Sequence, residues 1–219
     1  VDRISMTGFS AGGNLALSAA SAFGPEKIKA LVSYYAPLDG SAAGEPVGDA
    51  NGHPPKSPFR SGVILVSFVF SVFYAAYVPP QCDPGHPNLS VINIPLEKLP
   101  DHLFLITGDA DSLATESIRF YDNIMENGSR DQKYHSRLLI VPNEAHAFDE
   151  QPKHPESVHW RDKAYQQSVD VIRSAWYPDD GEPSNPPVAK PAPKATISFV
   201  TQQSAGAKDS SKPAPAIRG

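Results

Sequence analysis

Cysteine is almost missing from this chain of 219 residues, which contains only Cys82. A single cysteine excludes an intramolecular disulfide framework and a metal site built from several cysteines. Because it is typical of a reducing compartment, we expect a cytoplasmic location. The chain also lacks an excess of positive charge, since 19 Lys and Arg stand against 24 Asp and Glu, for a formal net charge of −5. We therefore expect no nucleic-acid partner.

Long apolar runs are also scarce, and the beginning of the sequence carries none of the kind that marks a signal peptide. The one long run covers residues 63–78 and has no charged side chain. It is shorter than the roughly 20 residues that a membrane helix needs, and Ser67 and Ser71 interrupt it. We expect a helix buried within a cap over the active site, and a membrane helix remains the alternative.

Short apolar strands alternate with helical patterns along the rest of the chain. Strands are predicted at residues 1–7, 28–35, 103–107 and 134–141, and helices at about residues 12–23, 115–127 and 159–176. We expect the helices to face the core with Leu15, Ala19 and Phe23, then with Ile118, Tyr121, Ile124 and Met125, and last with Ala164, Val169, Ile172 and Trp176. This alternation predicts an α/β fold with a mostly parallel sheet flanked by helices.

Proline is abundant, at 23 residues, and many prolines follow Tyr177 among Ala, Ser, Lys and Gly. This composition predicts a disordered tail over residues 178–219. Residues 1–177 are expected to form one domain, with a cap inserted at about residues 40–98.

The clearest motif is Gly8-Phe9-Ser10-Ala11-Gly12, between the first predicted strand and the first predicted helix. In this setting G-x-S-x-G is a nucleophile elbow, a strained turn that lifts the serine hydroxyl above the sheet. We expect side chains at positions 8 and 12 to collide there, which explains the two glycines. The Ala11 N–H, at the helix N-terminus, is expected to donate to an oxyanion. A chance turn rich in Gly and Ser is the alternative.

A nucleophilic serine needs a base and an acid that orients the base. After this elbow the expected order along the chain is the acid and then the histidine. Asp111 follows the third predicted strand and His146 follows the fourth, and the carboxyl ends of parallel strands meet at one edge of a sheet. Asp109 competes with Asp111 as the acid, and either could merely cap a turn. Among seven histidines, His146 alone has the expected place in order and loop.

Three motifs resemble a known family. Gly8–Ala16 reads G-F-S-A-G-G-N-L-A, and it resembles the elbow of the hormone-sensitive-lipase-like esterases, the fold-3 branch of the α/β hydrolases, which typically reads G-D-S-A-G-G-N-L-A. Asp111-Ser112-Leu113 resembles the family's D-P-L acid motif, which favours Asp111 over Asp109. His146-Ala147-Phe148 resembles its H-G-F motif.

The resemblance extends over about residues 1–176 and implies a partial α/β-hydrolase fold with the last four strands of the sheet. The family's H-G-G-G oxyanion motif and its first four strands should precede the elbow, where this sequence has no residues. We therefore expect residues 1–7 to form an unprotected sheet edge. We also expect these 219 residues alone to be nearly inactive, because oxyanion donors are missing.

Together these features predict a serine carboxylic-ester hydrolase for small to medium hydrophobic esters. Ser10 would attack the carbonyl, His146 would move the proton, and Asp111 would hold the imidazole. The expected contacts to the substrate come from Phe9, Phe70, Phe73 and Tyr74. No metal and no organic cofactor is implied, and the oligomeric state is not predicted.

Two other functions remain open. A serine peptidase of the prolyl-oligopeptidase type shares the elbow and the order of the triad, although its elbow usually carries a bulky residue where this chain has Ala11. A noncatalytic binding protein on the same fold is the second alternative. The presence of His146 argues against it, because some relatives with this fold that serve as hormone receptors have lost the histidine.

Overall fold

The computed structural model describes residues 3–42, 76–150, 152 and 154–178. All of these residues belong to one compact unit, Val1–Glu182. Most of the apolar run and nearly all of the proline-rich tail lie outside the described residues, so the cap helix and the disordered tail stay predictions.

Within the described residues, four strands form one sheet in the order β1-β2-β3-β4, and each neighbouring pair is parallel. The strands are β1 (Ile4–Phe9), β2 (Ile28–Tyr34), β3 (His102–Gly108) and β4 (Arg137–Val141). Their register pairs Phe9 with Tyr34, Tyr34 with Ile106, and Gly108 with Val141. The carboxyl ends of all four strands therefore lie along one edge of the sheet, as the predicted parallel sheet requires.

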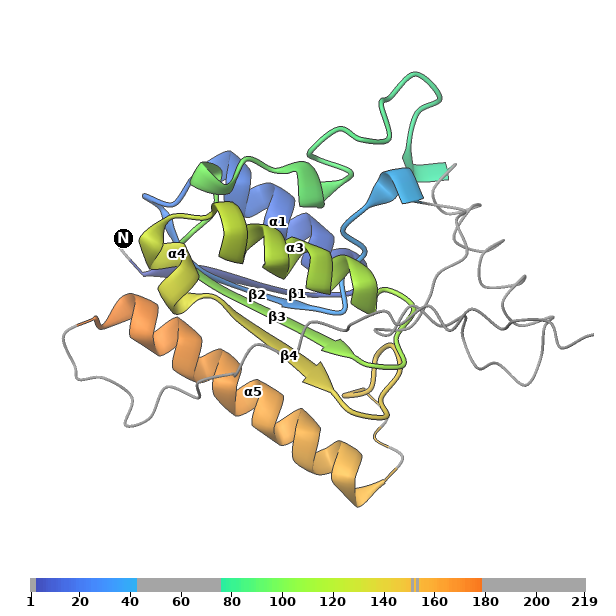
Figure 1. Cartoon of the computed structure of the whole chain (residues 1–219), viewed down its shortest axis with the longest axis vertical. Coiled ribbons are helices and arrows are strands. Elements are labelled where there is room, and N and C mark those ends of the chain that lie inside the picture. Colours follow the sequence, from blue (N-terminus) through green and yellow to red (C-terminus); the bar gives the residue numbers. More distant parts are fainter. Residues whose placement is uncertain (1–2, 43–75, 151, 153, 179–219) are drawn as a thin grey trace, which may run out of the picture. The chain divides into compact units, whose positions relative to one another are not determined.

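Helices cover both faces of this sheet. α1 and α3 lie on one face, and the long helix α5 crosses the other (Figure 1). The helices of the described residues are α1 (Ala11–Phe23), α3 (Ala114–Asn127), α4 (Arg130–His135) and α5 (Pro155–Trp176), with short 3-10 turns η1 (Gly40–Ala42), η2 (Val91–Asn93) and η3 (Leu96–Lys98). The predicted α/β class, with a parallel sheet between helices, is confirmed.

Two apolar clusters fill the space between the sheet and its helices. Alternate residues of β2 point to opposite faces, so Leu31 packs under α1 and α3, whereas Val32 packs against α5. Leu17 of α1 and Phe120 of α3 complete the first cluster, and Ala164 of α5 lies in the second. The central strands β2 and β3 are thus shielded from water on both faces.

The predicted core face of α1 is wrong. Leu15 is 53% exposed and Phe23 is 51% exposed, whereas the buried residues are Gly13, Ala16, Leu17 and Ala20. The physical reason is close packing, because a Cβ at Gly13 would lie 2.7 Å from the Cβ of Ala36. α1 approaches the sheet so closely that mainly small residues, together with Leu17, face the core, whereas Leu15 and Phe23 point outward.

Two further expectations need correction. The predicted strand at residues 134–141 begins only at Arg137, because Tyr134 and His135 belong to α4. That helix starts in a capping box, in which the side chains of Ser129 and Gln132 each bond the other's backbone N–H. In α5, Val169 is 52% exposed, and the buried positions are Ser157, Ala164, Ser168 and Val171.

Part of the range expected to form the cap lies against the sheet. Val91 and Ile94 are buried and belong to the cluster under α1 and α3. The boundaries of the cap remain a prediction, since residues 43–75 lie outside the description. In the part of the chain that is described, no helix combines the length and apolar character needed to cross a membrane.

Candidate active site

Ser10 occupies a sharp bend between β1 and α1. Its φ is 50° and its ψ is −124°. Residues other than glycine rarely adopt a positive φ. Holding a residue there costs about 1–3 kcal/mol, which the surroundings must offset. The Ser10 N–H donates to the Tyr34 carbonyl at 2.9 Å, and the Ser10 carbonyl accepts from the Gly13 N–H at 2.9 Å. These bonds tie the strained residue to both the sheet and the helix.

The glycines of the bend differ in the space around them. A Cβ at Gly8 would lie 2.0 Å from the Gly12 carbonyl oxygen, so a side chain at position 8 collides with the backbone of the turn. At Gly12, an added Cβ would meet no atom of the described residues within 4 Å apart from its chain neighbours and the backbone of its own helix. The steric reason expected for a glycine at position 12 is therefore not found there, and Gly13 is the second tight position.

Three side chains from distant parts of the chain meet above the sheet. The Ser10 Oγ lies 2.9 Å from His146 Nε2, and His146 Nδ1 lies 2.9 Å from Asp111 Oδ2. With the proton on Nδ1, His146 donates to the carboxylate, and Nε2 is left to accept from the serine hydroxyl. The Asp111 side chain is fully buried, whereas the His146 side chain is 34% exposed. The imidazole is thus open to solvent while its carboxylate partner is shielded.

The structure distinguishes the two candidate acids by their positions. Asp111 also accepts from the Leu113 N–H at 2.9 Å through Oδ1, so both of its oxygens are used. The Oδ1 of Asp109 is buried and has no hydrogen-bond partner among the described residues. Only Asp111 lies against His146.

Gly108 allows the acid loop and the histidine loop to touch. A Cβ at this residue would stand 2.0 Å from the Glu144 carbonyl oxygen. The same oxygen accepts from the Ala110 N–H at 3.0 Å, and the Asp109 N–H donates to the Val141 carbonyl at 2.9 Å. These contacts fix the loop after β3 against the loop after β4.

The histidine loop has two residues with left-handed backbone, Asn143 with φ 60° and Ala147 with φ 58°. Asparagine adopts this region more readily than most residues. Ala147 stands where the resembling family has glycine, and here alanine takes the conformation that glycine favours. The turn continues through a bond from the Glu150 N–H to the Ala147 carbonyl at 3.2 Å.

The remaining predicted site residues have different outcomes. Ala11 is the first residue of α1, and the first N–H groups of a helix have no acceptor within it. Phe9 is 40% exposed and stacks on Tyr34, with ring centroids 4.5 Å apart. The other predicted substrate contacts, Phe70, Phe73 and Tyr74, lie outside the described residues.

Two side chains near the site were not among the predicted site residues. The buried carboxylate of Glu116 accepts from the N–H groups of Leu38 and Asp39 at 2.6 and 2.9 Å. Burial raises the pKa of Glu116, although these two bonds act in the opposite direction. Asn14 donates to the carbonyls of Pro37 and Leu89. Both side chains anchor the segment that follows β2.

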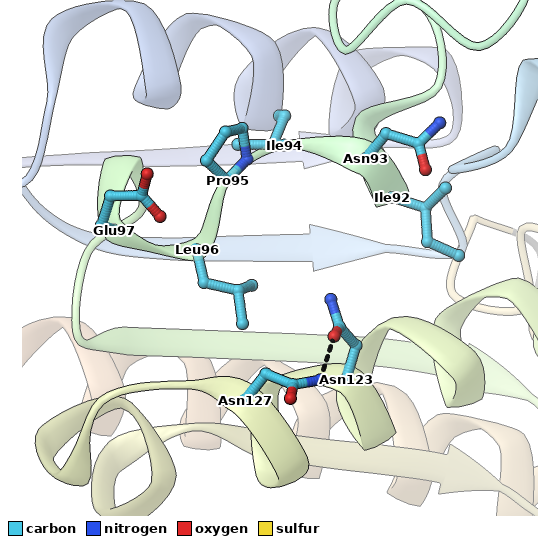
Figure 2. A pocket seen from close by; sticks show the side chains of 8 residues that line it. All are labelled: Ile92, Asn93, Ile94, Pro95, Leu96, Glu97, Asn123 and Asn127. Carbon is cyan, nitrogen blue, oxygen red and sulfur yellow. Dashed lines mark hydrogen bonds between the residues drawn. The ribbon is translucent and has the colours of Figure 1, made fainter.

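A separate hollow of about 420 Å³ lies between the segment of residues 92–97 and the C-terminal half of α3 (Figure 2). The side chains of Asn123 and Asn127 lie on its α3 side and are joined by a hydrogen bond of 2.8 Å. None of the predicted site residues lines it. Nor do the described residues contain a group of three or more His, Cys, Asp or Glu side chains that could hold a metal ion.

Comparison with protein families identifies the class of this fold. Residues 1–150 match the model of a family described as having the alpha/beta hydrolase fold. The chain belongs to this family, which confirms the family assignment drawn from the elbow. No curated protein matches the sequence.

Solved structures agree with this fold. An esterase from Pyrobaculum calidifontis is 21% identical, with a TM-score of 0.57 over 79% of this chain and 53% of its own. The esterase LipW from Mycobacterium marinum is 20% identical, with a TM-score of 0.54 over 78% of this chain and 50% of its own. A vibralactone cyclase is 17% identical, with a TM-score of 0.57 over 80% of this chain and 50% of its own. The chain thus spans about half the length of these structures.

Proposed function

We propose that the protein hydrolyses carboxylic esters with Ser10 as the nucleophile, His146 as the general base and acid, and Asp111 as the residue that orients the imidazole. The observation that supports this most is the unbroken hydrogen-bond chain from Ser10 Oγ through His146 to Asp111, with both links at 2.9 Å. The two similar structures described as esterases lend further support.

The geometry suits a reaction in two halves. The Ser10 Oγ attacks the ester carbonyl carbon, and its proton passes to His146 Nε2. The tetrahedral intermediate collapses, the bond to the alcohol breaks, and Nε2 returns the proton to the departing alcohol. Water then attacks the acyl group on Ser10 and gives its proton to Nε2. The acid product leaves, and Ser10 regains a proton.

Charge on the reacting oxygen needs donors that are already in place. We assign the Ala11 N–H to this role, because Ala11 begins α1 directly after the nucleophile and the positive end of a helix dipole favours an anion there. During the proton transfer, the buried Asp111 carboxylate stabilises the imidazolium that forms. Neither step calls for a metal or an organic cofactor.

The substrate class is proposed from the sequence. Phe9, Phe70, Phe73 and Tyr74 would supply an apolar surface that favours small to medium hydrophobic esters. Hydrolysis is favoured over a noncatalytic binding role, because a binding protein has no need of the Ser10–His146–Asp111 chain. A cytoplasmic location is proposed on the single Cys82, which is exposed.

We also propose that a polypeptide of only these 219 residues turns over esters poorly. The outer edge of β1 pairs with no described strand, and Ile4 and Phe9 on that strand are 37% and 40% exposed. Such an edge invites association with other chains. Robust turnover of p-nitrophenyl butyrate by this polypeptide would contradict the proposal.

The test of the main proposal is covalent labelling of the whole protein with a fluorophosphonate probe. Wild-type protein is expected to be labelled on Ser10, and Ser10→Ala is expected to abolish both labelling and ester turnover. Ser112→Ala is a suitable control. Ser112 is a serine next to the proposed acid, and it takes no part in the hydrogen bonds that Asp111 makes with His146 and Leu113. Labelling that persists in Ser10→Ala would rule out this nucleophile.

A further inference from the structure

A buried carboxylate lies just beyond the proposed histidine base. Asp149 is 5% exposed, and it belongs to the loop that carries His146. Its Oδ1 accepts from the Tyr35 hydroxyl at 2.6 Å, and its Oδ2 accepts from the Tyr165 hydroxyl at 2.7 Å. Tyr35 follows β2 and Tyr165 lies on α5. One side chain thus joins the histidine loop to the sheet and to the helix beneath it. We refer to Tyr35, Asp149 and Tyr165 as the tyrosine clamp.

The histidine loop wraps around the ring of Tyr35. The His146 ring lies against it at a centroid distance of 4.7 Å and an interplanar angle of 63°. Phe148 packs edge-on against the same ring at 6.1 Å. Asp149 then holds the hydroxyl at the far end of the ring. Three of four consecutive loop residues therefore contact one tyrosine.

Tyr35 is itself tightly fixed. It is 1% exposed and has a φ of 37°, which is unusual for a bulky residue. Its N–H donates to the Ile106 carbonyl at 2.6 Å. A ring held by its backbone at one end and by its hydroxyl at the other has little freedom to tilt.

The charges in the clamp are consistent with two neutral phenols that donate to one carboxylate. Burial and the bond to Asp149 raise the pKa of Tyr165 to about 12, and the same causes raise the pKa of Tyr35. Both hydroxyls therefore keep their protons near neutral pH. Removal of either partner would leave a buried polar group without its bond, which is destabilising in a water-poor site.

We propose that Asp149 and Tyr35 are positioning residues that set the imidazole of His146 between Ser10 and Asp111. The proposal rests on the proposed function, since it concerns the geometry of the same base. The imidazole must keep two bonds of 2.9 Å at once, and displacement by about 1 Å can cost roughly 100-fold in rate. The imidazole of His146 packs against the Tyr35 ring, which limits where the imidazole can lie. Asp149 in turn holds the Tyr35 ring in place.

The first test compares Asp149→Asn, Tyr35→Phe and the double variant in the whole protein. Each single variant is expected to lower kcat by about 10- to 100-fold while KM changes by less than about 3-fold, because a misplaced base slows the reaction more than it weakens binding. The double variant should lose little more than the worse single variant, since Tyr35→Phe removes the donor of the bond between Tyr35 and residue 149 and Asp149→Asn weakens its acceptor. Tyr165→Phe should have a smaller effect, because Tyr165 does not touch Tyr35 or His146 through its hydroxyl.

Tyr34→Phe is the matched control. Its hydroxyl forms a buried hydrogen bond of 2.8 Å with Ser168, and its ring has no contact with His146. Phenylalanine keeps the ring that packs against Tyr35 and the carbonyl that accepts from the Ser10 N–H, so only the hydroxyl is removed. It should lower the melting temperature as Tyr35→Phe does and keep kcat within about 3-fold of wild type. An equal loss of kcat in Tyr34→Phe and Tyr35→Phe would overturn the proposal, since general destabilisation would then explain both. So would kcat within 3-fold of wild type in Asp149→Asn and Tyr35→Phe.

A second measurement does not depend on turnover. In proton NMR, the Nδ1 proton of His146 that is shared with Asp111 should give a far-downfield signal, identified by its loss in His146→Gln. We expect the signal to broaden or vanish in Asp149→Asn and Tyr35→Phe and to persist in Tyr34→Phe. Should the wild-type protein lack esterase activity, the proposed function would fail and this signal would still test the clamp. An unchanged signal in Asp149→Asn would refute it.

Discussion

The two ends of the parallel sheet differ in backbone strain. Every described residue other than glycine with a positive φ follows the carboxyl end of a strand, namely Ser10, Tyr35, Asn143 and Ala147. At the amino end, the one positive φ belongs to Gly24, which precedes β2 and adopts 79° without a side-chain penalty. Backbone strain in the described residues therefore gathers at the end with the proposed chemistry, as is common where geometry matters more than stability.

The amino end of the sheet is held by ordinary local interactions. The rings of His102 and His135 stack with centroids 4.0 Å apart, and the guanidinium of Arg3 lies 4.1 Å from the centre of the Tyr177 ring. The capping box at Ser129 begins α4 beside them. A change at the carboxyl end should thus affect catalysis most, and a change at the amino end should affect only stability.

The largest effect is expected from Asp111→Asn. The amide removes the charge that stabilises the imidazolium and can favour the wrong tautomer, so kcat/KM should fall by about 10,000-fold. The melting temperature should change little, because asparagine has the same shape. Steady-state hydrolysis of p-nitrophenyl butyrate measures the loss. Asp109→Asn is the control, and a loss there as large as in Asp111→Asn would contradict the assignment of the acid.

Gly108→Ala should affect both stability and activity. The new Cβ would stand 2.0 Å from the Glu144 carbonyl oxygen, so the two loops must move apart, at a cost of about 3 kcal/mol in the free energy of unfolding. Urea denaturation measures that cost. The control is Gly85→Ala, whose nearest neighbour would lie 3.4 Å away. Equal stabilities of the two variants would show that the contact at residue 108 is unimportant.

The smallest effect concerns pH at the amino end. Burial, with contributions from His135 and Arg137, lowers the pKa of His102 to about 4. In the unfolded chain, His102 takes up its proton near a pKa of about 6.5. Between these values the unfolded state binds more protons, so the free energy of unfolding should fall as pH is lowered from 6.5 toward 4. After allowance for solvent screening, we expect about 1 kcal/mol between pH 7 and pH 5.

Thermal unfolding at several pH values measures this effect. His102→Phe should weaken the pH dependence and preserve ring stacking, whereas His159→Gln, at an exposed position of α5, should leave it in place. A pH dependence that is the same in His102→Phe and wild type would exclude His102 as its source.

Much of this fold could be predicted because its signals are local. Each strand is a short apolar run, and the bend at Ser10 is encoded by neighbouring residues. The side of α1 that faces the core was not predictable in this way. Apolar spacing favours Leu15 and Phe23, yet the distance between α1 and the sheet selects Gly13, Ala16 and Ala20. That distance is a property of the packed structure and not of the helix.

The same distinction applies to the site. Ser10 and His146 were recognisable by motif and by order along the chain. The choice between Asp109 and Asp111 rested on a resemblance, because both follow the same strand and only the loop path separates them. Tyr35 and Asp149 gave no signal, since a tyrosine and an aspartate separated by 114 positions carry no mark of their hydrogen bond.

The contact at Gly108 has a consequence for how the molecule can vary. The carbonyl oxygen of Glu144 is both the acceptor for the Ala110 N–H and the atom that forbids a side chain at residue 108. The turns that carry the carboxylate and the imidazole are consequently coupled, so that a shift of one turn displaces the other. An insertion in either turn would therefore displace the neighbouring turn as well. Changes in length should therefore be tolerated elsewhere on this molecule before they are tolerated here.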